Sequence, residues 1–143
     1  MNILLYGINF SPELTGIGKY TGKMADWLTT NEHTVKVVTA PPYYPEWKIG
    51  KEYKNRFFSE LNGNMTVYRC PLYVPSEPST IKRLLHLLSF ALSSFFVLIR
   101  LFFWRPHVVL VVEPTLFCAP MALIYARLTG AKIVLHIQDY EID

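Results

Sequence analysis

The chain opens with Asn2-Ile3-Leu4-Leu5-Tyr6-Gly7 and runs into a glycine-bearing turn at Thr15-Gly16-Ile17-Gly18-Lys19. Residues 3–6 are a short apolar run that is stopped by a glycine, a pattern typical of a buried strand. Apolar side chains then recur at helical spacing from residue 16 to about residue 31, and residues 34–40 are rich in β-branched side chains. Strand, glycine turn, helix and strand form a βαβ unit, which predicts parallel strands and a right-handed crossover.

The rest of the chain continues this alternation. The further predicted elements are strands at residues 66–70, 108–112 and 131–137, and helices at residues 80–104 and 116–129. The prolines of Pro41-Pro42-Tyr43-Tyr44-Pro45-Glu46-Trp47 exclude a helix or a central strand and predict an aromatic loop. The order of elements predicts one domain over residues 1–143, with a Rossmann-like, doubly wound parallel α/β sheet.

Composition sets broad limits on function. Of the 143 residues, 51% are hydrophobic and 17% are charged, which is ample material for the core of one domain. The net charge of +3 fits an anionic ligand or an acidic membrane surface, whereas nucleic-acid binding would need a denser basic stripe. Cys70 and Cys118 are expected to be buried, reduced thiols, and no metal-binding motif accompanies them.

The long predicted helix raises the question of a membrane. Residues 84–104 are 21 positions with one full charge, Arg100. A helix over residues 80–104 would span roughly 37 Å, enough to cross a bilayer core of about 30 Å. The polar side chains nevertheless fall within an arc of about 140°; they are Lys82, Arg83, His86, Ser89, Ser93, Ser94 and Arg100.

This amphipathic pattern leaves three alternatives: a helix on the membrane surface, a core helix packed on the sheet, or a membrane span. A span would place the flanking strands of one sheet on opposite sides of the membrane, so we disfavour it. Membrane-surface docking would use Lys82, Arg83 and Arg100 as lipid contacts. The polar arc is not clean, because Phe90, Val97 and Trp104 interrupt it.

The glycine turn before the first helix is a candidate phosphate site. A helix N-terminus presents unpaired N–H groups and partial positive charge, and glycine lets a ligand approach the backbone. The candidate contacts are Gly16, Ile17, Gly18 and Lys19. The turn matches neither the P-loop nor the dinucleotide fingerprint, because Thr21 stands where the third glycine belongs. An ordinary loop-to-helix junction, with Lys19 in solvent, is the alternative.

Polar residues also gather where predicted strands end. His136 and Asp139 lie at the end of the last strand and are candidate catalytic residues, since imidazole and carboxylate groups can bind or orient a sugar hydroxyl. Glu113 follows the preceding strand, and Glu13 lies in the first loop. Both are candidates to bind the hydroxyl group of an acceptor substrate. Carboxyl ends of parallel strands share one sheet edge, where ligands bind. A structural histidine and an exposed loop glutamate are the alternatives for His136 and Glu13.

Three separated motifs carry a family resemblance. They are the loop from Tyr6 to Tyr20, which reads Tyr-Gly-Ile-Asn-Phe-Ser-Pro-Glu-Leu-Thr-Gly-Ile-Gly-Lys-Tyr, the stretch Thr39-Ala40-Pro41-Pro42-Tyr43-Tyr44-Pro45, and His136-Ile137-Gln138-Asp139-Tyr140-Glu141. Together they resemble the N-terminal domain of family-four-type GT-B glycosyltransferases, and most closely the colanic acid biosynthesis glycosyltransferase group. The resemblance covers essentially the whole chain.

The resemblance implies the N-terminal half of a GT-B fold and a retaining transfer from a nucleotide-sugar, in exopolysaccharide biosynthesis, without a metal or other cofactor. It implies that Gly16 and Gly18 approach the donor diphosphate and that His136 faces the transferred sugar. The implied acceptor is a polyprenyl-diphosphate-linked saccharide at the inner face of the cytoplasmic membrane. The long basic amphipathic helix would bring the site to that membrane.

One part of the family pattern is missing from these residues: the C-terminal domain with the nucleotide pocket. We therefore expect residues 1–143 alone to transfer no sugar at a meaningful rate, unless a C-terminal domain acts in trans. Two other functions stay open. One is a non-catalytic adaptor at the membrane surface. The other is a nicotinamide-binding Rossmann domain, against which the second strand ends at Val38-Thr39-Ala40 without an acidic residue for the ribose.

Overall fold

The protein is described here by a computed structural model that covers residues 1–14, 16–113 and 117–138. The strands are β1 (Asn2–Tyr6), β2 (Thr34–Thr39), β3 (Phe58–Asn62), β4 (Met65–Arg69), β5 (Val108–Glu113) and β6 (Lys132–Ile137). The helices are α1 (Gly16–Thr30), α2 (Thr80–Arg100) and α3 (Cys118–Thr129), with a short 3₁₀ helix η1 (Phe102–Trp104) after α2.

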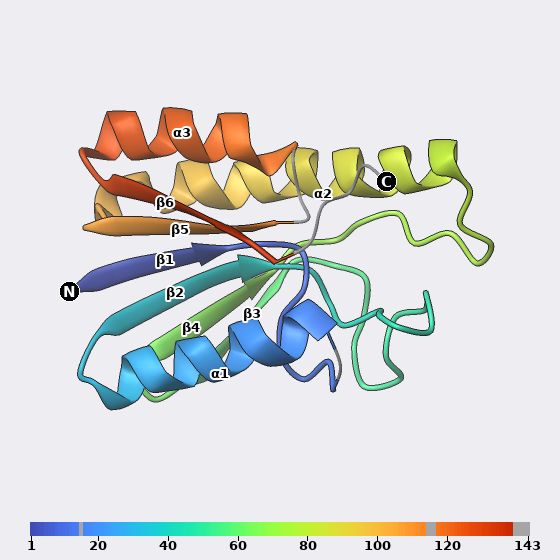
Figure 1. The fold of residues 1–143 in the computed structure, drawn as a ribbon, viewed down its shortest axis with the longest axis horizontal. Helices are drawn as coiled ribbons and strands as arrows, with labels where there is room; N and C mark the ends of the chain where they lie inside the picture. Colours follow the sequence, from blue (N-terminus) through green and yellow to red (C-terminus); the bar gives the residue numbers. More distant parts are fainter. Residues whose placement is uncertain (15, 114–116, 139–143) are drawn as a thin grey trace.

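All six strands form one sheet in the order β3-β4-β2-β1-β5-β6. Every neighbouring pair is parallel except β3 and β4, which are antiparallel. Helix α1 covers one face of the sheet, and α2 and α3 lie together on the other (Figure 1). The doubly wound, Rossmann-like prediction is confirmed, and the parallel strands all end at one edge.

Two predictions about single elements were wrong. Strand β3 was not expected, because Phe58-Ser59-Glu60-Leu61-Asn62 is mostly polar and mostly exposed at the edge of the sheet, so it shows no buried run. The long helix was expected to reach residue 104, but α2 ends at Arg100 and η1 follows it. Helix α3 begins at Cys118, and the first residue expected for it, 116, lies outside the described residues.

Helix α2 lies on the sheet through a face that mixes polar and apolar residues. Its buried residues are His86, Phe90, Ala91, Ser94, Val97 and Leu98. Phe90 and Val97, which interrupt the polar arc in the sequence, are therefore core contacts. The two polar members of this face have partners: Ser94 Oγ bonds the Tyr6 hydroxyl, and His86 Nδ1 donates to the Tyr73 carbonyl at 2.6 Å. These bonds offset part of the cost of burying the two side chains, although His86 Nε2 has no hydrogen-bond partner among the described residues.

Within the described ranges, α2 is the one helix long and apolar enough to span a membrane by length and composition, and 33% of its most apolar window is buried. The strands on either side of it, β4 and β5, belong to the same sheet. Because α2 also packs on that sheet, the arrangement does not fit a membrane span.

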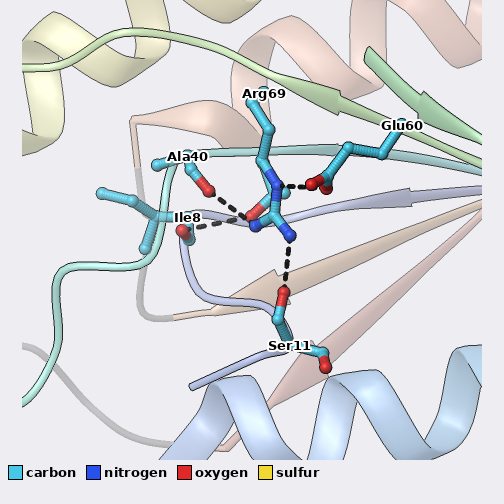
Figure 2. Close-up of polar contacts among 6 residues, drawn as sticks. Ile8, Ser11, Ala40, Glu60 and Arg69 are labelled. Carbon is cyan, nitrogen blue, oxygen red and sulfur yellow. Dashed lines mark hydrogen bonds and ion pairs between the residues drawn. The ribbon is translucent and has the colours of Figure 1, made fainter. Parts of the chain in front are cut away.

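A buried arginine ties together the two loops at the carboxyl edge of β1 and β2 (Figure 2). Arg69, at the end of β4, is 2% exposed. Its Nη2 donates to the Ser11 carbonyl at 2.6 Å and its Nη1 to the Ala40 carbonyl at 2.9 Å. Its Nε forms an ion pair with Glu60 of β3 at 3.1 Å. One side chain therefore holds the loop after β1, the end of β2 and the edge strand in fixed positions.

Replacing Arg69 with methionine tests this role. The Ser11 and Ala40 carbonyls would lose their donors, so we expect Arg69→Met to lower the free energy of unfolding by about 3 kcal/mol. Denaturant unfolding measures the change. The matched control is Arg56→Met, because Arg56 is exposed and no side-chain contact is found for it among the described residues. Equal stability of the two variants would contradict the role of Arg69.

The buried His86 predicts a dependence of stability on pH. Burial lowers the pKa of His86 below its ordinary value of 6.5, against a smaller opposing effect of its bond to Tyr73. Below pH 6.5 the unfolded chain therefore binds a proton at His86 that the folded chain still excludes. As the pH is lowered from 6.5 to the pKa of His86 in the folded protein, the free energy of unfolding decreases.

We expect the variant His86→Gln to lose this part of the pH dependence. Glutamine can still donate to the Tyr73 carbonyl, but it does not titrate. The check is the thermal unfolding midpoint of both proteins, measured from neutral pH downward through 6.5. Parallel curves for the two proteins would show that His86 does not contribute.

Candidate functional site

A cavity of about 320 Å³ opens at the carboxyl edge of the sheet, between the loop after β1 and the loop after β2. Pro12, Glu13 and Leu14 line it from the first loop, and the second loop contributes residues from Pro42 to Tyr53. Three of the lining residues are tyrosines: Tyr43, Tyr44 and Tyr53. The aromatic loop predicted from the prolines is thus one wall of a cavity.

Glu13 joins the two loops that line the cavity. Its Oε1 accepts hydrogen bonds from the backbone N–H groups of Tyr43 and Tyr44, both at 3.2 Å. Its Oε2 accepts from Asn9 Nδ2 at 3.1 Å. Glu13 is 5% exposed, so the alternative of an exposed loop residue was wrong. The carboxylate holds the aromatic loop against the end of β1.

Burial raises the pKa of Glu13 above its ordinary value. The hydrogen bonds from Tyr43, Tyr44 and Asn9 and the positive charge of Arg69 act in the opposite direction, since they favour the ionised carboxyl. Glu13 accepts three hydrogen bonds and lies near the buried charge of Arg69. Its role is therefore structural, at the base of the cavity.

The glycine turn packs directly against this carboxylate. A Cβ added to Gly18 would lie 2.5 Å from Glu13 Oε2 and 2.8 Å from Glu13 Cβ. A Cβ on Gly22, one turn later, would lie 2.8 Å from the Cβ of Ser11. Both positions of α1 therefore need glycine so that the first loop can fold back on the helix. Gly16 differs, because its φ of +65° is in the left-handed region that favours glycine.

This packing role accounts for Gly18 without a ligand. Gly16 and Lys19 are exposed and Ile17 is half-buried, so three of the four predicted phosphate contacts lie toward solvent at the start of α1. Phosphate binding there stays a prediction.

His136 lies near the same end of α1. It is the penultimate residue of β6, half-buried, and pairs in register with Val112 of β5. Gln138, two residues later, donates from Nε2 to Thr21 Oγ1 of α1 at 3.5 Å. Residues two apart in a strand share a face, so His136 lies on the face of the sheet that α1 covers. The structure thus brings a predicted catalytic residue toward the predicted glycine turn.

The other sequence candidates are placed less fully. Glu113 is the last residue of β5, opposite Ile137 of β6, and its role stays a prediction. Asp139 lies outside the described residues. Lys82, Arg83 and Arg100 are exposed on α2 and do not line the Glu13 cavity, although the Arg83 guanidinium lies 5.7 Å from the centre of the ring of Trp47, in the loop that does.

Sequence reasoning missed Arg69 and assigned no role to the tyrosines. A signal for Arg69 existed, because Met65, Val67 and Arg69 share the buried side of β4. An arginine at a position where the alternation predicts a core residue needs partners, and so marks a buried polar site.

The described residues contain no cluster of metal-ligand side chains, and both cysteines are buried. Over residues 1–14, 16–113 and 117–138, no group of three or more His, Cys, Asp or Glu side chains could hold a metal ion. Cys70 and Cys118 are both buried, as expected, and burial raises the pKa of the Cys70 thiol to about 12.

The chain is similar to known proteins in both sequence and structure. The chain is 59% identical, over all 143 residues, to a protein of Escherichia coli (strain K12) that is named as a colanic acid biosynthesis glycosyl transferase, WcaI. The match covers 35% of that protein, so the chain spans about a third of the length of this relative.

A solved structure shares the fold. Sucrose-phosphate synthase from Thermosynechococcus elongatus, a GT-B glycosyltransferase, superposes with a TM-score of 0.56 at 11% sequence identity, over 95% of this chain and 32% of that one. The Rossmann-like half of a GT-B fold, expected from the sequence, is thereby confirmed. Residues 15–143 match the family described as the glycosyl transferase 4-like domain, and the chain belongs to that family.

Proposed function

We propose that this chain is the acceptor-side domain of an enzyme that transfers a sugar from a nucleotide-sugar to a saccharide with retention of anomeric configuration. In this reaction the bond between the anomeric carbon and the donor diphosphate breaks. A bond from that carbon to an acceptor hydroxyl oxygen forms, and nucleoside diphosphate and a proton are released. No metal or other cofactor is needed for this balance.

The cavity beside Glu13 is the observation that carries the acceptor assignment. Tyrosine rings offer apolar faces for sugar rings, and the surrounding polar groups can bind hydroxyls. Two exposed glutamates (Glu46 and Glu52) and two exposed lysines (Lys48 and Lys51) line it, so it has no excess of positive charge to attract a diphosphate. A neutral saccharide fits this balance better than the donor does.

We assign the donor to the neighbouring region where β6 ends beside α1. The start of α1, where Gly16 and Lys19 are exposed and Ile17 is half-buried, would face the donor diphosphate. His136 would donate a hydrogen bond to the transferred sugar, with Asp139 orienting a hydroxyl. Glu113 would act on the acceptor side. Much of the electrostatic stabilisation of the leaving diphosphate would come from a second, nucleotide-binding domain.

Because that second domain contributes half of such a site, we expect residues 1–143 alone to be inactive. The acceptor is proposed to be a polyprenyl-diphosphate-linked saccharide used in exopolysaccharide biosynthesis, at the inner face of the cytoplasmic membrane. The whole protein would thus be a peripheral membrane enzyme.

Of the two other functions, one keeps some support. A non-catalytic membrane adaptor would also explain the exposed apolar residues of α2. A nicotinamide-binding domain is not supported: Thr39, at the end of β2, is fully buried and donates to the Ile8 carbonyl at 3.1 Å, so it is not available to a ribose.

Sugar transfer by the full-length protein is the direct test. A panel of nucleotide-sugars is offered with a lipid-linked or a water-soluble saccharide, and the anomeric configuration of the product is read by NMR. Retention is expected. No transfer from any donor would favour the adaptor, and an inverted product would contradict the retaining mechanism.

The variant Tyr44→Leu tests the acceptor cavity. Tyr44 is 42% exposed and lines the cavity, so its ring can be removed without opening the core. Loss of one aromatic contact, worth about 1 kcal/mol, should raise the acceptor KM several-fold. The donor KM should change less, although the ring lies 3.5 Å from the position of a Cβ on Gly16. The control Tyr73→Leu removes a ring that is 44% exposed outside the cavity, and should change neither constant. A rise in the donor KM alone would indicate that the donor, and not the acceptor, binds in this cavity.

The variant His136→Ala tests the donor side. If His136 binds the transferred sugar in the transition state, its loss should lower kcat by about 100-fold and change the acceptor KM little. His33→Ala is the control, because His33 precedes β2 at the opposite edge of the sheet. Unchanged kcat in His136→Ala would make this histidine structural.

A further inference from the structure

Helix α2 exposes an apolar stripe on the side that faces away from the sheet. The stripe consists of Ile81, Leu84, Leu85, Leu88, Leu92, Phe95, Phe96 and Ile99 of α2, with Phe103 of η1. Their exposed fractions range from 41% to 85%. At 100° per residue all nine fall within an arc of about 120°. A continuous apolar patch of this kind marks an interaction surface.

The charged residues of α2 and of the segment that follows it are all basic. From residue 78 to residue 112 the sequence has no aspartate or glutamate, and its four full charges are Lys82, Arg83, Arg100 and Arg105. All four are exposed. They stand at the two ends of the helix. Basic side chains beside an apolar helical face complement anionic lipid headgroups above an acyl layer.

The stripe continues into a second cavity. This cavity, of about 280 Å³, lies between α2 and the edge strands, and Phe57, Phe96 and Arg100 are among the residues that line it. Phe57 is itself 51% exposed. Aromatic rings beside a guanidinium are typical of groups that lie at the boundary between headgroups and acyl chains.

We propose that the apolar stripe of α2 inserts into the interfacial region of an anionic bilayer, with the helix axis in the membrane plane. The stripe provides the apolar contact, and Lys82, Arg100 and Arg105 bind headgroup phosphates. Arg83 is not one of these contacts, because its guanidinium lies 5.7 Å from the centre of the Trp47 ring, on the side of the helix opposite the stripe. The opposite face, with Phe90 and Val97, stays on the sheet. The stripe would be the surface through which the proposed enzyme binds the membrane. The proposal rests on the proposed function, because a lipid-linked acceptor is the reason for the protein to bind a membrane.

Vesicle binding by the full-length protein, without donor or acceptor, tests the proposal. The vesicles are phosphatidylglycerol with phosphatidylethanolamine, and phosphatidylcholine alone. The stripe variant is Leu85→Gln/Leu92→Gln/Phe96→Gln. The control variant, Trp27→Gln/Leu61→Gln/Leu128→Gln, removes three side chains that are at least as exposed on other elements. Circular dichroism checks that both variants fold.

The stripe variant should bind anionic vesicles at least about tenfold more weakly than the wild type, because three inserted side chains are lost. The control variant should bind like the wild type. The variant Lys82→Glu/Arg100→Glu should also bind weakly, and the wild type should prefer anionic to phosphatidylcholine vesicles. Transfer to a water-soluble saccharide should be the same in all four proteins, which separates failure of docking from failure of the proposed activity.

Three results would overturn the proposal. The first is unchanged vesicle binding by the stripe variant. The second is a wild-type protein that binds neither kind of vesicle. The third is a stripe variant that turns a dimer into a monomer in gel filtration while no form binds vesicles, since the stripe would then join two copies of the chain.

Discussion

The carboxyl edge of this sheet depends on one buried guanidinium. A cation removed from water must be matched by acceptors, and Arg69 finds them in the Ser11 and Ala40 carbonyls and in Glu60. Those partners belong to three segments that are distant in the sequence. Once Arg69 is satisfied, the loops after β1 and β2 face each other, and Glu13 can accept from the backbone of Tyr43 and Tyr44. The cavity follows from these two charged side chains.

The same packing changes how the glycine turn is understood. A glycine before a helix suggests a ligand at the backbone, yet the space beside Gly18 is filled by Glu13 and the space beside Gly22 by Ser11. Here glycine lets a loop return onto its own helix. Gly16, with its positive φ and exposed backbone, keeps the features that a ligand would use. A short motif therefore combines positions with different physical reasons for glycine.

The sequence predicted β1, β2 and β5 from their apolar and β-branched runs, and β4 from its alternating pattern. It also predicted β6 as a buried strand, but β6 lies at the edge of the sheet and most of its residues are exposed. It did not predict β3, whose polar residues carry no such pattern, or the orientation of α2. Both faces of that helix hold large apolar residues, and the face that packs on the sheet includes His86 and Ser94. Which face is buried depends on the partners that Tyr6 and Tyr73 offer. Those partners come from other elements, so the periodicity of one helix cannot show them.

The same contacts couple the proposed acceptor cavity to α2, the helix for which we propose membrane contact. Tyr43 lines the cavity, and its ring lies 4.7 Å from the ring of His86, which also contacts Trp47 at 5.0 Å. The first turns of α2 extend past the strand ends, on the same side as the loops (Figure 1). Buried aromatic contacts of this kind allow little independent movement. A bilayer that fixes α2 would therefore also fix the distance of the cavity from the membrane and its orientation. A lipid-linked saccharide could then reach the cavity without a separate recruiting domain.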